Sequence, residues 1–300
     1  MISSESAQDN STERILDKLC KHIVCLSWLD ALISPDVTKD APPSYQPAAF
    51  AISSFVIAVQ GLWCLVTAGH ILSDLERRLK NGRRIVKSRL IDAMAGASGT
   101  GSIPFDLENA PRWHIDDNAG LDYGVILLRP LFVHQLLAGG IQALTAESWI
   151  DIPSDPDACF LLGFPKAAKR SDVRQFEGGG DIQIEVGTPL LPVEWIDNPP
   201  ESLRKTADRY YAKVPIITAD ESGLGEDFID IDGMSGGPLF LVKNKSEGGL
   251  RYWIAGVQSS WLPDLRVLAA CPIQPLADGI SRCIDRHGYL EDGHMPSPKK

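Results

Sequence analysis

The chain has 300 residues, of which 44% are hydrophobic and 23% are charged, a composition typical of a soluble globular protein with one or two domains. Its formal net charge of −10 argues against a nucleic-acid partner. No apolar run approaches the roughly 18 residues that a membrane-spanning helix needs, so no membrane partner is expected.

The N-terminal sequence and the cysteines together predict a cytoplasmic protein. Glu5 and Asp9 precede the first apolar residues, and the apolar run 23–26 is too short for the core of a secretory signal. Without export, the cysteine thiols are expected to stay reduced. No CxxC pair or Cys/His cluster has zinc spacing, so no metal is expected. The six cysteines are Cys20, Cys25, Cys64, Cys159, Cys271 and Cys283.

Residues 1–44 predict a helix followed by an extended connector. Ser11 is a candidate N-cap for a helix that runs to about Leu32. This helix either packs on the back of the strand-rich region that follows, or regulates access to it or docks a regulatory partner. Three prolines make residues 34–47 an extended connector. The apolar positions at roughly helical spacing are Ile15, Leu16, Leu19, Ile23 and Leu26.

A first strand-rich unit is predicted over about residues 45–145. The apolar stretch 49–66 is broken at Gln60-Gly61, which predicts a β-hairpin with its turn at Gly61. A short helical stretch is expected from Ile71 to Lys80. Weaker strands are expected between residues 85 and 128.

A second strand-rich unit is predicted over about residues 150–272, and the apolar segment 159–162 opens it. A helix over about 274–287, stopped by Gly288, follows it. Residues 289–300 form a polar tail. The other strands of the second unit are expected at about 182–186, 210–217, 228–232, 238–243 and 252–258.

The segment Gly233-Met234-Ser235-Gly236-Gly237-Pro238 is the main chemical signal in the sequence. A serine flanked by glycines is suited to nucleophilic attack, because small neighbours admit a substrate carbonyl and glycines allow N–H groups to converge on one point. Serine alone is a weak nucleophile and needs a base, and the base needs an orienting group.

Two upstream segments supply such groups. His70 ends the apolar segment Leu65-Val66-Thr67-Ala68-Gly69-His70, and Asp122 directly precedes the stretch Tyr123-Gly124-Val125-Ile126-Leu127-Leu128. A carboxylate that precedes a buried strand is fixed and partly shielded, whereas Asp116 and Asp117 lie in a polar run. Asp122 is therefore the favoured orienting group, with Asp117 as the reserve.

Together these segments resemble the trypsin/chymotrypsin-like serine peptidases, and they occur in that family's order of His, Asp and Ser. The resemblance covers about residues 45–288. It implies an all-β fold of two six-stranded antiparallel β-barrels with an active-site cleft between them, here with an added N-terminal helix and a C-terminal helix. It also implies a serine endopeptidase that acts on a protein or peptide substrate, with no metal or organic cofactor.

The resemblance assigns a role to each site residue. Ser235 would be the nucleophile, His70 the general base and then acid, and Asp122 the group that orients His70. The backbone N–H groups of Gly233 and Ser235 would form the oxyanion hole.

The family pattern places the specificity pocket at Ile229, with Asp230 beside it, and on the strand that contains Ser259. An apolar Ile229 suits a small or apolar substrate side chain, whereas an inward Asp230 favours Lys or Arg. Strand alternation puts these two neighbours on opposite faces, so the choice stays open. Met234 stands where digestive-type members carry an aspartate that pairs with a newly cut N-terminus. We therefore expect no maturation by that route.

Two other functions fit parts of the sequence. Gly233-Met-Ser-Gly-Gly also matches the G-x-S-x-G nucleophile elbow of α/β-hydrolases, which requires a helix after the serine. A catalytically silent, peptidase-like binding or scaffold protein is the second alternative, because fold does not fix function.

Overall fold

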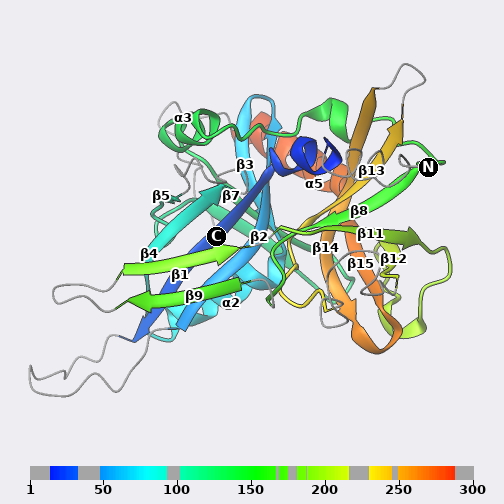
Figure 1. Cartoon of the computed structure of the whole chain (residues 1–300). Coiled ribbons are helices and arrows are strands. Elements are labelled where there is room, and N and C mark those ends of the chain that lie inside the picture. The colour runs from blue at the N-terminus through cyan, green and yellow to red at the C-terminus, as the bar shows by residue number, and fades with distance from the viewer. Residues whose placement is uncertain are drawn as a thin grey trace, which may run out of the picture.

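The computed structural model describes residues 14–32, 48–92, 102–166, 169–174, 181–186, 188–215, 230–244 and 249–287. The chain folds into two antiparallel β units that lie side by side, with short helices around them (Figure 1). The described part of the chain has no helix that is long and apolar enough to cross a membrane.

The first unit is a seven-stranded sheet in the order β5-β4-β1-β2-β3-β7-β6. The prediction of a closed six-stranded barrel here is wrong, because the sheet contains one more strand and, in the described part of the chain, its outer strands β5 and β6 pair only with β4 and β7. β5 spans three residues and ends at Pro104, which has no N–H to extend the pairing. The strands are β1 (Ile23–Leu32), β2 (Ala48–Val59), β3 (Leu62–Thr67), β4 (Arg83–Asp92), β5 (Ser102–Pro104), β6 (Arg112–Asp116) and β7 (Asp122–Leu127).

The additional strand is β1, and it corrects the prediction of an N-terminal helix that reaches Leu32. The helix covers residues 14–20 and the chain is extended from Ile23. β1 pairs with β2 and β4 along its two edges, and both of its faces are buried, because Ile23 packs in one core cluster and Val24 in another. A strand buried on both faces has apolar residues at consecutive positions, and such a pattern cannot be distinguished from that of a helix by spacing.

Several local predictions in this unit are confirmed. Gln60 (φ 50°) and Gly61 (φ 82°) form the two-residue turn between β2 and β3, where positive φ angles match the strand twist. The helix after His70 is α2 (Gly69–Lys80). A further helix, α3 (Pro130–Ala138), follows β7 and is absent from the sequence-based expectations.

The second unit is a closed six-stranded barrel, as predicted, in the order β11-β12-β15-β14-β13-β8. The strand expected at 228–232 is wrong for residues 230–232, which form no strand, while 228–229 lie outside the described residues. The strand expected at 182–186 exists, but it pairs with β9 in a separate two-stranded sheet. The barrel strands are β8 (Ala158–Leu162), β11 (Leu190–Trp195), β12 (Tyr210–Lys213), β13 (Pro238–Asn244), β14 (Leu250–Leu262) and β15 (Val267–Pro272).

The remaining elements surround these two units. The two-stranded sheet consists of β9 (Lys169–Arg174) and β10 (Asp181–Val186). The predicted C-terminal helix is α5 (Ile273–His287), which contacts β14 and β2. Short 3-10 helices lie at η1 (Ala146–Ser148), η3 (Glu201–Leu203) and η5 (Pro263–Leu265).

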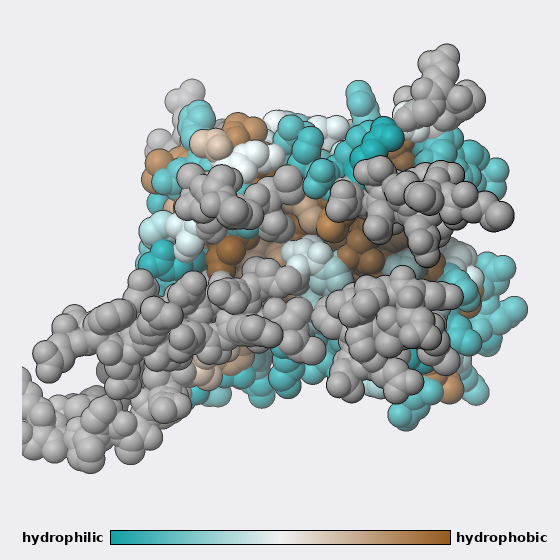
Figure 2. Space-filling model, in the orientation of Figure 1, coloured by the Kyte–Doolittle hydropathy of each residue, from teal (hydrophilic) through white to brown (hydrophobic). Residues whose placement is uncertain are grey.

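One apolar cluster joins the two units. It contains Phe55 and Tyr123 from the first sheet, Phe240 and Ile254 from the barrel, and Leu276 from α5. Hydrophobic residues also gather near the middle of the face in Figure 2, with hydrophilic residues around its outer margins. The apolar residues of the 14–20 helix pack on the same cluster, as the structural interpretation of that helix expects.

Candidate active site

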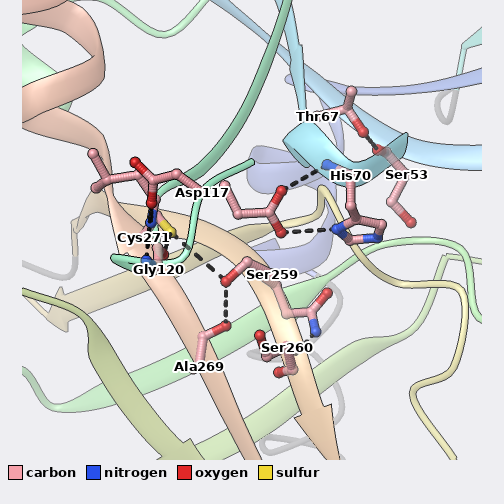
Figure 3. Close-up of polar contacts among 12 residues, drawn as sticks. Ser53, Thr67, His70, Asp117, Gly120, Ser259, Ser260, Ala269 and Cys271 are labelled. Carbon is pink, nitrogen blue, oxygen red and sulfur yellow. Dashed lines mark hydrogen bonds and ion pairs between the residues drawn. The ribbon is translucent and has the colours of Figure 1, made fainter. Parts of the chain in front are cut away.

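The structure brings His70 and Asp122 together through two hydrogen bonds. The ring Nδ1 of His70 lies 2.8 Å from Asp122 Oδ2, and the backbone N of His70 donates to Asp122 Oδ1 at 2.8 Å (Figure 3). His70 begins α2 immediately after β3, and Asp122 begins β7, which is the neighbour of β3 in the sheet. Because β3 and β7 are antiparallel neighbours, the end of β3 lies beside the start of β7, and the two side chains meet at that end of the sheet.

Gly69 makes this close approach possible. A β-carbon at Gly69 would overlap the carbonyl group of Ile115 and lie 2.9 Å from the backbone N of Tyr123. No other residue would let the start of α2 sit so deeply against β6 and β7. The backbone N–H of His70 can reach the carboxylate only from this position.

The charge around His70 favours its protonated form. Burial lowers the pKa of the imidazole, but the hydrogen bond to Asp122 and the negative charges of Asp122, Asp116 and Asp74 raise it, and the net result is a pKa above 6.5. Because a carboxylate can only accept, Nδ1 carries the hydrogen, and the lone pair of neutral His70 is on Nε2. The His70 side chain is 42% exposed and that of Asp122 is 11% exposed. The Asp122 carboxylate is thus shielded from solvent, whereas the His70 ring remains accessible.

The reserve candidate Asp117 is engaged in its own turn. Its Oδ1 accepts hydrogen bonds from the backbone N–H groups of Gly120 and Leu121, both at 3.0 Å. Asp117 therefore shapes the loop that leads to Asp122, and its carboxylate makes no contact with His70 among the described residues.

The Ser235 segment forms a tight turn that packs on the end of β3. Gly233 (φ 87°) and Gly236 (φ 89°) adopt backbone angles that favour glycine. A β-carbon at Gly236 would lie 2.8 Å from the backbone N of Ala68, two residues before His70. Ser235, which is partly exposed, therefore lies beside the strand end that carries His70. Within the described residues, the Ser235 hydroxyl makes no hydrogen bond.

The peptide groups of this turn are held in a defined orientation. The backbone N of Lys166 donates to the carbonyl of Asp232 at 2.7 Å, and the backbone N of Gly237 donates to the carbonyl of Met234 at 2.8 Å. The chain has no cis peptide bond in its described part, so each N–H points away from the carbonyl of the residue before it. The N–H groups of Gly233 and Ser235 are therefore directed away from these two anchoring contacts.

The structure places the predicted pocket residues in different surroundings. Ile229 lies outside the described residues. Asp230 is exposed, and its Oδ1 accepts hydrogen bonds from Trp261 Nε1 at 3.2 Å and from the backbone N of Asp232 at 3.0 Å. Ser259 is buried and donates to the carbonyl of Ala269 at 3.2 Å (Figure 3).

The sequence did not single out Arg209, which lies beside Ser259. Its guanidinium donates to the hydroxyls of Ser259 and Ser260. Arg209 also lies 3.4 Å from the position that a β-carbon at Gly120 would occupy. Nothing in the polar run 204–209 distinguishes Arg209 from its neighbours. Its contact with Ser259 and Ser260 forms only when the strands of the barrel come together.

The cysteines and the acidic residues give no sign of a metal centre. None of the six cysteines forms a disulfide; five are buried and Cys283 is exposed. Across the described ranges, no group of three His, Cys, Asp or Glu side chains could hold a metal ion.

The α/β-hydrolase alternative is wrong. It requires a helix directly after the nucleophile. Here β13 begins at Pro238, only three residues after Ser235, and pairs with β8 and β14.

No family model and no curated protein matches this sequence. Solved structures similar to the chain include the protease Anisep from Arthrobacter nicotinovorans, with 14% identity, 87% of this chain and 96% of that chain covered, and a TM-score of 0.45. Deg5 is another, with 14% identity, 93% of this chain and 94% of that chain covered, and a TM-score of 0.42. A third is a catalytically inactive tobacco etch virus protease in complex with substrate, with 10% identity, 87% of this chain and 85% of that chain covered, and a TM-score of 0.36. These similarities are low, and what the chain does has to be inferred from its own residues.

Proposed function

We propose that this protein is a serine endopeptidase that cleaves a protein substrate through an acyl-enzyme intermediate. The observation that carries the proposal is the double hydrogen bond between His70 and Asp122, located beside the glycine-rich turn of Ser235. The three residues take the roles of the trypsin-type template.

In the first step, the Ser235 oxygen attacks the substrate carbonyl carbon while His70 Nε2 takes the hydroxyl proton. Asp122 stabilises the resulting imidazolium and keeps Nδ1 directed toward itself. The carbonyl oxygen becomes an oxyanion, for which the N–H groups of Gly233 and Ser235 are the proposed donors.

In the next steps, His70 returns its proton to the leaving amine, the C–N bond breaks, and an ester to Ser235 remains. Water then attacks this ester with His70 as the base, which releases the carboxylic acid product and restores the serine hydroxyl. The amine carries away the proton that Ser235 released, and water supplies the proton that restores the serine hydroxyl; both pass through the same imidazole.

We propose that the enzyme works in the cytoplasm without proteolytic maturation. Six cysteines without a disulfide, five of them buried, suit a reducing compartment. Met234 is buried in the barrel core and cannot form an ion pair with a new N-terminus. β1, which precedes Ala49, is a central strand of the first sheet, so the uncut chain already contributes to the fold.

A fluorophosphonate serine-hydrolase reagent tests the proposal directly. The full-length protein should be labelled covalently, and Ser235→Ala and His70→Ala should not be labelled while remaining folded by circular dichroism.

A catalytically silent binding protein is the second candidate, because the Ser235 hydroxyl makes no hydrogen bond to His70 in this structure. Absence of labelling in the folded wild-type protein would favour it. A regulatory partner at the 14–20 helix is the remaining proposal on partners, and it would be recognised by labelling that appears only when the partner is added.

A further inference from the structure

Strand β2 carries two adjacent serines whose hydroxyls have different partners. Ser53 and Ser54 are both fully buried. The hydroxyl of Ser54 donates to the carbonyl of Val24 in the neighbouring strand β1, and so stays within the first sheet. The hydroxyl of Ser53 leaves the sheet and contacts the other unit.

Ser53 Oγ connects two segments of the barrel unit. It donates to the carbonyl of Gly233 at 3.2 Å and accepts from the backbone N of Phe164 at 2.8 Å. Because the Phe164 N–H occupies a lone pair of the oxygen, the hydroxyl proton is free to point at Gly233. The serine is therefore a directed donor to the turn that contains Ser235.

This bond completes the anchoring of three successive carbonyls in the turn. The carbonyls of Asp232 and Met234 are held by backbone N–H groups of the barrel unit. The carbonyl between them, that of Gly233, is held by the Ser53 side chain. It lies between the two N–H groups proposed as oxyanion donors, so its orientation sets their spacing.

The flexibility of the turn gives this anchor its importance. Gly233 has a φ of 87°, and a glycine rotates its adjacent peptide groups more freely than any other residue. The backbone of Ser53 is itself fixed, since its carbonyl accepts from Thr67 Oγ1 at 2.8 Å. A rigid donor on the first sheet thus restrains a conformationally permissive segment of the second unit.

We propose that Ser53 is a positioning residue for the oxyanion site: its hydroxyl, held by the Phe164 N–H, fixes the Gly233 carbonyl and thereby the spacing of the Gly233 and Ser235 N–H groups. This inference rests on the proposed peptidase function. Ser53 touches no reacting atom and acts through the turn.

The chain offers a matched control for this role. Ser53→Ala and Ser54→Ala each remove one buried hydroxyl from neighbouring positions of the same strand, and each removes one side-chain hydrogen bond to a backbone carbonyl. Ser53→Cys keeps a weaker donor and acceptor at the same place. It also provides a readout if Ser53→Ala does not fold.

The kinetic test uses p-nitrophenyl acetate, which needs no side-chain specificity. Ser53→Ala should lower kcat by about 10- to 100-fold with little change in KM, since a small misplacement of catalytic groups costs up to about 100-fold. Ser53→Cys should be intermediate, and Ser54→Ala should stay within about twofold of wild type. Equal kcat values for Ser53→Ala and Ser54→Ala would overturn the proposal.

A second measurement does not depend on activity. Amide NMR of the folded variants should show changed shifts and faster hydrogen exchange for Met234 and Ser235 in Ser53→Ala but not in Ser54→Ala. Unchanged amides in both variants would overturn the positioning role even if the protein proved catalytically silent. Failure of wild-type labelling by fluorophosphonate would instead refute the proposed function alone.

Discussion

Gly236 lies so close to Ser53 that a β-carbon on Gly236 would be 2.5 Å from the Ser53 carbonyl oxygen. The turn that carries the proposed nucleophile therefore rests directly on the sheet that carries the proposed base.

Replacing Gly236 with alanine should disrupt this contact. The positive φ alone costs about 1–2 kcal/mol for a residue with a side chain, and the overlap with β2 and β3 adds to it. We expect a clear fall in Tm and loss of fluorophosphonate labelling. Gly140→Ala is the control, because Gly140 has a φ of 90° and no atom lies within 4 Å of the position that its β-carbon would take. Equal effects of the two substitutions would show that the close packing is unimportant.

Replacing Asp122 with asparagine should reduce kcat while the fold persists. The amide retains the size of the side chain but removes the charge that stabilises the imidazolium of His70. In the trypsin-type template this change costs about 10⁴-fold in kcat. Steady-state ester hydrolysis measures the effect, with Asp117→Asn as the control, whose loss should be small. Comparable losses of kcat in the two variants would contradict the assignment of the orienting role to Asp122 alone.

The pH dependence of activity should report the raised pKa of His70. Since the base must be neutral, activity should be lost as pH falls through an apparent pKa above 6.5. The same protonation favours the folded state: its contribution to stability is complete below about 6.5 and is lost as pH rises through the folded pKa. NMR titration of the His70 ring should give a matching value. In Asp122→Asn that value should fall, because the lowering effect of burial then dominates; an unchanged value would contradict this account.

His22 should make the protein sensitive to acid in the opposite sense. Burial lowers the pKa of its imidazole to about 4, and its ring contacts the Gln142 carbonyl and the Tyr252 hydroxyl. The folded pKa is below the unfolded value near 6.5, so stability is complete above 6.5 and falls as pH drops toward about 4. The shift corresponds to a loss of about 3 kcal/mol.

Urea unfolding at several pH values measures this loss. His22→Gln should flatten the dependence between pH 6.5 and 4, whereas His134→Gln, which changes an exposed residue on α3, should leave it intact. An equally steep decline in His22→Gln would assign the acid sensitivity to other groups.

Unprocessed protein that retains Met1 should be fully reactive toward fluorophosphonate. The reason is that the buried Met234 needs no partner from a cut N-terminus, and the residues before Ala49 include a central strand. Deletion of residues 2–13 should leave labelling unchanged, whereas deletion through residue 32 removes β1 and should prevent folding. A requirement for cleavage before Ala49 would contradict this prediction.

The features predicted correctly from the sequence are those that local chemistry determines. The turn at Gln60-Gly61 follows from glycine placed between two apolar runs, and the positions of His70 and Asp122 follow from polar residues at the ends of buried strands. β1 escapes prediction because both of its faces are buried, so apolar residues stand at consecutive positions and the alternation typical of a strand is missing. The first barrel is wrongly expected to close because nothing in the sequence marks the pairing of outer strands.

The contacts of the site are beyond sequence reasoning for a different reason. Ser53 and Gly233 are separated by 180 positions, and their bond exists only after two units dock. The one signal is a Ser53-Ser54 pair inside an otherwise apolar strand, where a buried hydroxyl needs a partner.

The dependence of the Ser235 turn on the first sheet has a consequence for biosynthesis. His70 and Asp122 leave the ribosome long before Ser235, so an interrupted chain contains a base and its carboxylate but no nucleophile. A separately folded second barrel would have the nucleophile without its base. On the proposed function, neither fragment can digest its neighbours, and proteolytic competence arises only when translation of both halves is complete.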